Sequence, residues 1–184
     1  MMFRFERNTQ KNMKRNEIKD VHEGSVLESF KKQSVYLNKI IEVISKPEPP
    51  DAIITINGNT TWIEITDAFF SRELAQSVTT HVADDKTHKP VPKEKRFCIE
   101  PDEQFSSTLE SVIVKKYDKE SIGKVYKQYG SGILLVGVIN PFFAAKNLVN
   151  IEKQRILEAV KSKEERFNEI YLYDVYDHIF HKLL

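Results

Sequence analysis

The chain has 184 residues, of which 40% are hydrophobic and 30% are charged, and its formal net charge is +1. This length is enough for one domain with a sizeable core, and a nucleic-acid-binding face would need acidic residues elsewhere to balance it. The single cysteine, Cys98, excludes an intramolecular disulfide framework. No apolar run approaches the ~18 residues of a membrane span, and the N-terminus lacks the apolar segment of a secretory signal. We therefore expect a cytoplasmic protein that does not contact a membrane.

Residues 1–20 are locally basic. Their basic side chains are Arg4, Arg7, Lys11, Lys14, Arg15 and Lys19, against the acidic Glu6, Glu17 and Asp20. A basic arm that contacts phosphates has this composition, and so does an ordinary solvated terminus. We treat residues 1–20 as an N-terminal arm and residues 21–184 as a single domain.

A helix is predicted from Ser25 to Ser45. Apolar residues recur there at the three-and-four spacing of a helix face. These residues are Leu27, Phe30, Leu37, Ile41 and Ile44. Ser25 to Glu28 has the form of a capping box, which places the start of the helix at Ser25. The proline-rich segment 46–50 would end it, because proline lacks the amide donor and clashes with the preceding turn.

A β-hairpin is predicted next. Residues 51–56 and 59–66 are rich in β-branched side chains, and Asn57-Gly58 joins them. Asn-Gly between two such runs is the strongest short-range hairpin signal, since both residues tolerate the positive φ of a type I′ turn.

The rest of the chain alternates between helical and strand-like segments. Residues 67–104 are irregular and are interpreted as an insertion, with a short helix near 71–78 and a polar loop through 86–95. The later predictions are a helix at 105–117 that continues or restarts through 126, a buried strand at 133–139, a helix at 150–167 and a strand at 170–176. This order predicts an α/β fold, a three-layer sandwich in which helices flank a mixed β-sheet.

The hairpin brings two acids together. If Asn57-Gly58 is the two-residue loop, pairing outward from it places Asp51 opposite Glu64. Like charges in such a position repel at close range, so two carboxylates there either share a proton or bind a cation. Oxygen ligands of this kind suit Mg²⁺ or Mn²⁺. The alternative is another register, in which Glu64 pairs with a lysine at a sheet edge.

At these residues the sequence resembles the PD-(D/E)XK nuclease superfamily. Pro50-Asp51 enters one strand, and Glu64-Ile65-Thr66 lies on the next, behind the expected helix; the resemblance covers residues 21–139. It implies a restriction-endonuclease-like fold and Mg²⁺-dependent hydrolysis of phosphodiester bonds in DNA. Asp51 and Glu64 would be catalytic and would bind the metal, with the carbonyl of Ile65 as a further ligand.

Thr66 departs from the family pattern, which has a lysine at this position. A threonine hydroxyl carries no charge and cannot replace the lysine beside the attacking water. Lys116 lies on the apolar stripe of the helix that begins near Phe105, and the resemblance to members with a relocated lysine makes it the candidate, with Lys119 second. Lys116 could equally lie in the last helical turn and extend to water.

The family pattern also includes an acid on the first helix, for which Glu28 and Glu23 compete. Glu28 is also the expected capping-box residue, and Glu23 precedes the predicted helix start. The alternative function is that of a nuclease-fold protein without catalytic activity, which binds nucleic acid or a partner protein, or forms a homodimer. Thr66 and the near-neutral charge favour it.

Overall fold

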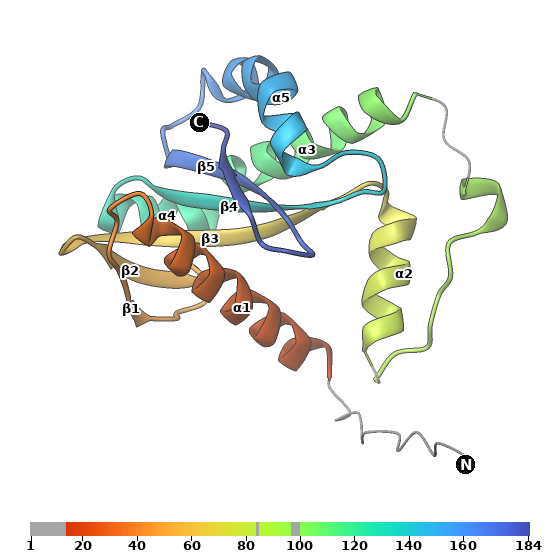
Figure 1. Ribbon diagram of the computed structural model, residues 1–184, viewed down its shortest axis with the longest axis horizontal. Helices are drawn as coiled ribbons and strands as arrows, with labels where there is room; N and C mark the ends of the chain where they lie inside the picture. Colours follow the sequence, from red (N-terminus) through yellow and green to blue (C-terminus); the bar gives the residue numbers. More distant parts are fainter. Residues whose placement is uncertain (1–13, 84, 97–99) are drawn as a thin grey trace, which may run out of the picture.

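The computed structural model describes residues 14–83, 85–96 and 100–184 (Figure 1). Most of the predicted basic arm, residues 1–13, and Cys98 lie outside the described residues. The end of that arm, from Arg15 onward, belongs to the first helix. Within the described part of the chain, no helix is both long enough and apolar enough to cross a membrane.

The helices and strands follow one another in a mixed order. The helices are α1 (Arg15–Val35), α2 (Arg72–Val82), η1 (Lys93–Lys95), α3 (Pro101–Asp118), α4 (Glu120–Tyr129) and α5 (Ala145–Val160). The strands are β1 (Ile41–Ser45), β2 (Ala52–Ile56), β3 (Asn59–Phe69), β4 (Gly132–Ile139), β5 (Phe167–Asp174) and β6 (Phe180–Lys182).

The strands form one open, mixed sheet in the order β1-β2-β3-β4-β5-β6. Strands β3, β4 and β5 are parallel to one another, and β1, β2 and β6 add antiparallel edges. Parallel neighbours require crossover connections, which α2, α3 and α4 supply between β3 and β4, and α5 supplies between β4 and β5. The chain is therefore α/β, as predicted.

Helices cover both faces of this sheet (Figure 1). On one face, Phe105, Leu109 and Ile113 of α3 share a buried cluster with side chains of α4, α5 and the central strands. On the other face, Leu27 and Phe30 of α1 pack in a second buried cluster. Burial of apolar stripes on both sides of a sheet is what holds such layers together, and the arrangement is compatible with the predicted three-layer sandwich.

The hairpin prediction is confirmed, together with its register. Asn57 and Gly58 have φ values of 50° and 84°. Pairing runs from Ile56 opposite Asn59 outward to Ala52 opposite Ile63. Asp51 directly precedes the last of these pairs, so the sequence-derived alignment with Glu64 continues the observed register.

The predicted first helix is wrong at both ends. It begins at Arg15 and not at Ser25, and it ends at Val35, before the prolines. Asn38 takes a positive φ of 56°, and the amide of Lys39 donates to the carbonyl of Ser34 at 3.0 Å. This left-handed residue reverses the chain as asparagine often does after a helix, and residues 41–45 then pair with β2 as a strand.

Other boundaries shift less. The strand predicted at 133–139 is β4, and the short helix predicted near 71–78 is α2, whose N-terminus is capped by Ser71 accepting from the amide of Leu74 at 3.0 Å. The helix predicted at 150–167 is wrong at both ends, because α5 is Ala145–Val160 and Phe167 opens β5. Strands β1 and β6 were not predicted.

Candidate functional site

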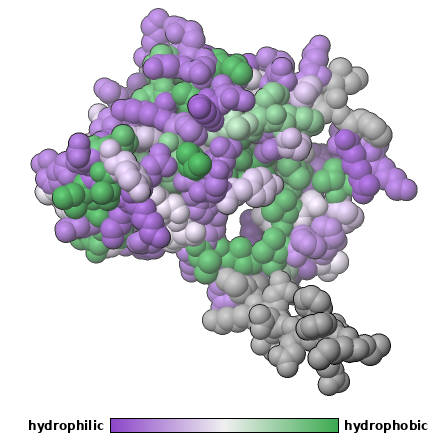
Figure 2. Space-filling view, in the orientation of Figure 1, coloured by the Kyte–Doolittle hydropathy of each residue, from purple (hydrophilic) through white to green (hydrophobic). Residues whose placement is uncertain are grey.

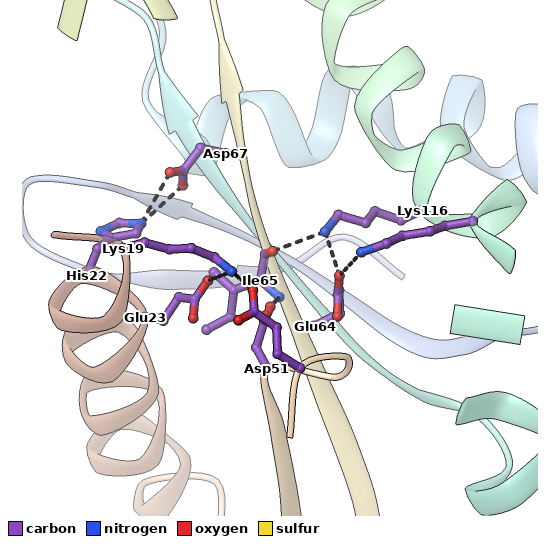
Figure 3. A network of polar contacts seen from close by, with 10 residues as sticks. Lys19, His22, Glu23, Asp51, Glu64, Ile65, Asp67 and Lys116 are labelled. Atoms are coloured by element: carbon purple, nitrogen blue, oxygen red, sulfur yellow. Dashed lines mark hydrogen bonds and ion pairs between the residues drawn. The ribbon is translucent and has the colours of Figure 1, made fainter. Parts of the chain in front are cut away.

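Glu64 lies in the middle of β3 and is 2% exposed. Its strand is flanked by β2 and β4, and Glu64 points to the sheet face that α3 covers, as Trp62 does two residues earlier. Its Oε1 accepts hydrogen bonds from Nζ of Lys116 at 2.6 Å and from Nζ of Lys119 at 3.4 Å (Figure 3). Two ammonium groups therefore converge on a single oxygen of this carboxylate.

The second oxygen of Glu64 has a different environment. Oε2 is buried and has no hydrogen-bond partner among the described residues. Leaving a buried anionic oxygen without a partner is costly. Such an atom in a native fold calls for an explanation, and a bound ion is one of the explanations that apply.

Asp51 lies at the start of β2 and is 9% exposed. Its Oδ2 accepts a hydrogen bond from the amide of Ile65 at 2.6 Å. The pKa of Asp51 is raised to about 6, mainly by burial and then by the charges of Glu64 and Glu23, while the amide of Ile65 and the charge of Lys116 oppose this shift. The two acids are therefore electrostatically coupled, and the site favours a proton or a cation beside Asp51.

Glu23 approaches the acid pair from α1. It forms an ion pair with Lys19 at 3.5 Å, and Lys19 also contacts Glu48. Glu23 and Asp51 both line a cavity of about 360 Å³, and Figure 3 shows Glu23 on the side of Asp51 opposite to Lys116. The expectation that Glu23 precedes the helix is wrong, because α1 begins at Arg15.

Glu28 is placed differently. It lies within α1, one turn beyond Glu23, with its side chain exposed. Its predicted capping-box role is wrong, since Ser25 is inside the helix and not at its start. None of the described hydrogen bonds or ion pairs at the acid pair involves Glu28. Of the two predicted helix acids, the structure brings only Glu23 to the acid pair.

Lys116 lies where the apolar stripe of α3 places it. Leu109 and Ile113 are buried on that stripe, and Lys116 continues it by one turn, so its ammonium reaches both Glu64 and the carbonyl of Ile65, the latter at 3.3 Å. Lys115 is exposed, as its neighbouring position on the helix requires. Lys119 lies between α3 and α4 and is more exposed than Lys116.

A divalent cation fits the donors at this site. The described residues contain no group of three or more His, Cys, Asp or Glu side chains arranged to hold a metal. Mg²⁺, however, usually binds through one or two carboxylates and keeps several waters. The unpartnered Oε2 of Glu64 and the coupled carboxylate of Asp51 are oxygen donors of that kind. The carbonyl of Ile65 is a third oxygen beside them, although Lys116 contacts it in this structure.

Sequence reasoning missed a second polar cluster on the opposite face of β3. Oδ1 of Asp67 accepts from the hydroxyl of Tyr173 at 3.0 Å, and Oδ2 lies 3.2 Å from Nε2 of His22. The hydrogen bond to Asp67 raises the pKa of His22, and burial raises the pKa of Tyr173. These three residues come from α1, β3 and β5, so no local pattern joins them.

Gly137 is the signal that could have indicated this cluster. It interrupts the apolar run of β4 and pairs with both Asp67 and Tyr173. A Cβ at this position would lie 2.2 Å from Oδ1 of Asp67 and 2.8 Å from the hydroxyl of Tyr173. Glycine inside a strand often marks such a close approach, and here it leaves the space that the hydrogen bond occupies.

Comparison with known proteins adds no identification, since no protein-family model, no curated protein and no solved structure matches the chain.

Proposed function

We propose that the protein is a metal-dependent nuclease that hydrolyses phosphodiester bonds in DNA, with a restriction-endonuclease-like fold. One observation carries the proposal: the buried carboxylate of Glu64 offers one oxygen to Lys116 and holds the other without a partner, beside the coupled acid Asp51. A buried acid pair beside a half-buried lysine is an arrangement that stability alone does not favour, and acids whose pKa is raised by burial, as that of Asp51 is, cluster at catalytic sites.

Lys116 supports the proposal because it supplies the charge that Thr66 lacks. Its ammonium reaches the acid of the β3 motif from α3, at 2.6 Å from Glu64. In hydrolysis, the oxygen of a water attacks phosphorus, the bond to the leaving oxygen breaks, and that oxygen takes up a proton. Lys116 would orient the attacking water and stabilise the charge that develops on the phosphate. Lys119, at 3.4 Å from the same oxygen, is placed to assist.

Asp51 and Glu64 would hold Mg²⁺ or Mn²⁺ with the carbonyl of Ile65. The ion would lower the pKa of a bound water and screen the phosphate. Glu23, from α1, adds negative charge on the far side of Asp51, and this charge further favours a cation at the site. The order of the elements supports the fold assignment: an acid-bearing helix, an Asp at the entry of one strand and a Glu on the next.

A second function is favoured by the same lysines. Lys116 and Lys119 already neutralise one oxygen of Glu64, and Lys116 also contacts the carbonyl of Ile65. Two ammonium groups can therefore occupy positions that a metal and its waters would need. In that case the protein binds nucleic acid or a partner protein without cutting.

The test is a cleavage assay on the full-length chain. Single-stranded DNA, duplex DNA and RNA are incubated with Mg²⁺, with Mn²⁺ or with a chelator, and products are resolved on a denaturing gel. We expect metal-dependent cleavage of DNA that Asp51→Ala and Glu64→Ala each abolish. Glu42→Ala is the matched control, because Glu42 is an exposed acid on a neighbouring strand. Cleavage that persists in both site variants would refute the assignment.

A binding assay separates the two functions. Fluorescence anisotropy with labelled DNA measures affinity in the presence of a chelator, where cleavage cannot occur. If the wild-type chain binds DNA but cuts no substrate with either metal, the second function is supported and the first is rejected. Metal binding itself is followed as a rise in thermal stability with Mg²⁺, which Glu64→Ala should remove.

A further inference from the structure

A second hollow lies on the α1 side of the sheet, between α1, α2 and the ends of the central strands. It has a volume of about 510 Å³, within the ~300–1,000 Å³ typical of small-molecule sites. Figure 2 shows the surface hollowed between these two helices, with hydrophobic side chains along its border. Basic, apolar and polar residues together line its walls and floor.

The first kind is basic. Arg15, Lys19 and His22 line the hollow at helical spacing on one face of α1, together with the apolar Ile18. Arg15 and Lys19 have exposed side chains at the start of this helix. The ammonium of Lys19 is ion-paired with Glu23 and Glu48, so Arg15 is the positive group that the rim offers. A positive group held at the mouth of an open cavity attracts a phosphate.

The second kind is apolar. Val78 and Val82 of α2 face the strand ends across the hollow, where Phe69 and Ile139 close β3 and β4. Val78 and Val82 are exposed, so a ligand between these walls would cover apolar surface on both of its sides. A flat heterocyclic ring buries its faces well in such a space, and a phenylalanine at the wall adds a surface for stacking.

The third kind is polar and lies at the floor. Asp67 is held in place by Tyr173 at 3.0 Å and by His22 at 3.2 Å. A carboxylate has about four lone-pair positions, so Asp67 retains capacity to accept from an N–H group of a ligand. Asn16 and Thr79 are further polar side chains on the walls. A few fixed polar groups in an otherwise apolar pocket give orientation and specificity.

We propose that this cavity binds one nucleotide. The base lies between the apolar walls, with its polar edge toward Asp67, and its phosphate contacts Arg15. The nucleotide is either free or an unstacked residue of a DNA strand whose backbone continues to the acid pair. Only the strand-bound form rests on the proposed function. Asp67, His22 and Tyr173 then act in recognition, while Asp51 and Glu64 act on the phosphodiester.

The experiment measures nucleotide binding by the full-length chain in a chelator, using isothermal titration calorimetry. The probes are the four deoxynucleoside 5′-monophosphates, the four deoxynucleosides (deoxyadenosine among them) and 2-deoxyribose 5-phosphate. We expect at least one monophosphate to bind at least about tenfold more tightly than either part alone, because base and phosphate are recognised together. If no monophosphate binds more tightly than the sugar phosphate, the proposal is overturned.

Two variants locate the binding in this cavity. Val78→Trp fills the space between the walls and should weaken monophosphate binding at least about tenfold, whereas Val35→Trp adds the same side chain at an exposed valine outside the cavity and should not. Arg15→Gln should weaken monophosphates but not deoxyadenosine. Circular dichroism verifies that each variant is folded. Unchanged monophosphate binding in both Val78→Trp and Arg15→Gln would reject the site.

A third measurement distinguishes the two sources of the nucleotide. The fluorescence of a 2-aminopurine in a DNA oligonucleotide increases when this base leaves the base stack. An increase on binding identifies an unstacked residue of a DNA strand as the ligand. Monophosphate binding without such an increase identifies the free nucleotide as the ligand. Glu64→Ala should abolish cleavage and leave monophosphate binding unchanged. If the wild-type chain cleaves no substrate in any condition but still binds a monophosphate, the proposed function is refuted and the cavity is supported.

Discussion

Glu64 and Asp67 lie three residues apart on one strand, point to opposite faces of the sheet, and meet opposite kinds of partner. Glu64 faces α3, where two lysines converge on one of its oxygens and the other oxygen has no described partner. Asp67 faces α1, where a tyrosine and a histidine contact both of its oxygens. The side chain of Glu64 is 2% exposed and that of Asp67 is 22% exposed, and only Asp67 has a described partner for each of its oxygens.

This difference indicates two different tasks. A buried carboxylate with a vacant oxygen and a neighbouring acid attracts a cation. A carboxylate held by a tyrosine hydroxyl and a histidine ring is a rigid hydrogen-bond acceptor at the floor of a cavity. Such a group is suited to recognition and not to metal binding. Under both proposals, this one strand would present the chemistry on one face and the recognition on the other. The following four predictions test that separation.

The largest effect is expected from Lys116→Ala. If Lys116 orients the attacking water, its loss should lower the rate of DNA cleavage by about 10²–10⁴-fold. Lys115→Ala is the matched control, since Lys115 is the exposed neighbour on the same helix, and it should change the rate less than about twofold. Single-turnover kinetics with excess enzyme measures the chemical step directly. A fully active Lys116→Ala protein would remove the lysine from the mechanism.

The next effect concerns the pH dependence of stability through Asp51. Its folded pKa of about 6 exceeds its ordinary value of 3.8, so the folded state binds the proton more tightly and loses stability as pH rises through this interval. Above pH 6 the ionised group should cost up to about 3 kcal/mol. Asp51→Asn should therefore be more stable than wild type at pH 7.5 in a chelator and similar to it near pH 4. Urea unfolding at both pH values measures this, and an equal difference at both would contradict it.

Gly137→Ala tests the other face. The added Cβ would collide with Asp67 and Tyr173, and forcing an atom into a packed interior typically lowers the free energy of unfolding by about 1–3 kcal/mol. Gly24→Ala is the control, because the nearest atom to a Cβ there is Nζ of Lys46 at 3.7 Å and alanine favours the helix. We expect Gly24→Ala to stabilise slightly by urea unfolding. Equal stability of the two variants would show that Asp67 and Tyr173 move apart freely.

The smallest effect is expected from His22. Its pKa is raised, mainly by the hydrogen bond to Asp67, so the stabilisation from charged His22 is present below its ordinary pKa of 6.5 and is lost as pH rises through the higher folded value. His22→Gln should remove this loss, because glutamine can donate to Asp67 at any pH. Thermal unfolding of both proteins between pH 6 and 9 measures the difference. His178, whose pKa is lowered by burial, is common to both proteins.

The sequence predicted the parts of the site that depend on local geometry. The Asn57-Gly58 turn determines the hairpin register by itself, and that register aligns Asp51 with Glu64. The stripe of α3 likewise places Lys116 by its helical period alone. Neither prediction needs knowledge of how distant segments pack, which explains why both could be made from short stretches of the chain.

The sequence failed where two signals coincided. Ile41 and Ile44 continue the period of the first helix by chance, although they belong to β1, and Asn38 was the overlooked sign of the helix end. The error moved the expected helix forward and excluded Glu23 from it. The nucleotide-sized cavity was beyond reach for another reason: it joins α1, α2 and strand ends that are distant in sequence.

Trp62 gives the acid pair a built-in optical reporter. It is the only tryptophan of the chain, it is fully buried two residues before Glu64, and its indole N–H donates to the carbonyl of Gly130 at 2.8 Å. Its ring also packs against the backbone of β4 at Gly132, where a Cβ would lie 2.4 Å from it. All tryptophan emission from this protein therefore originates in the hairpin strand that carries Glu64. Cation binding and unfolding of the sheet can be followed by this emission in the unlabelled chain.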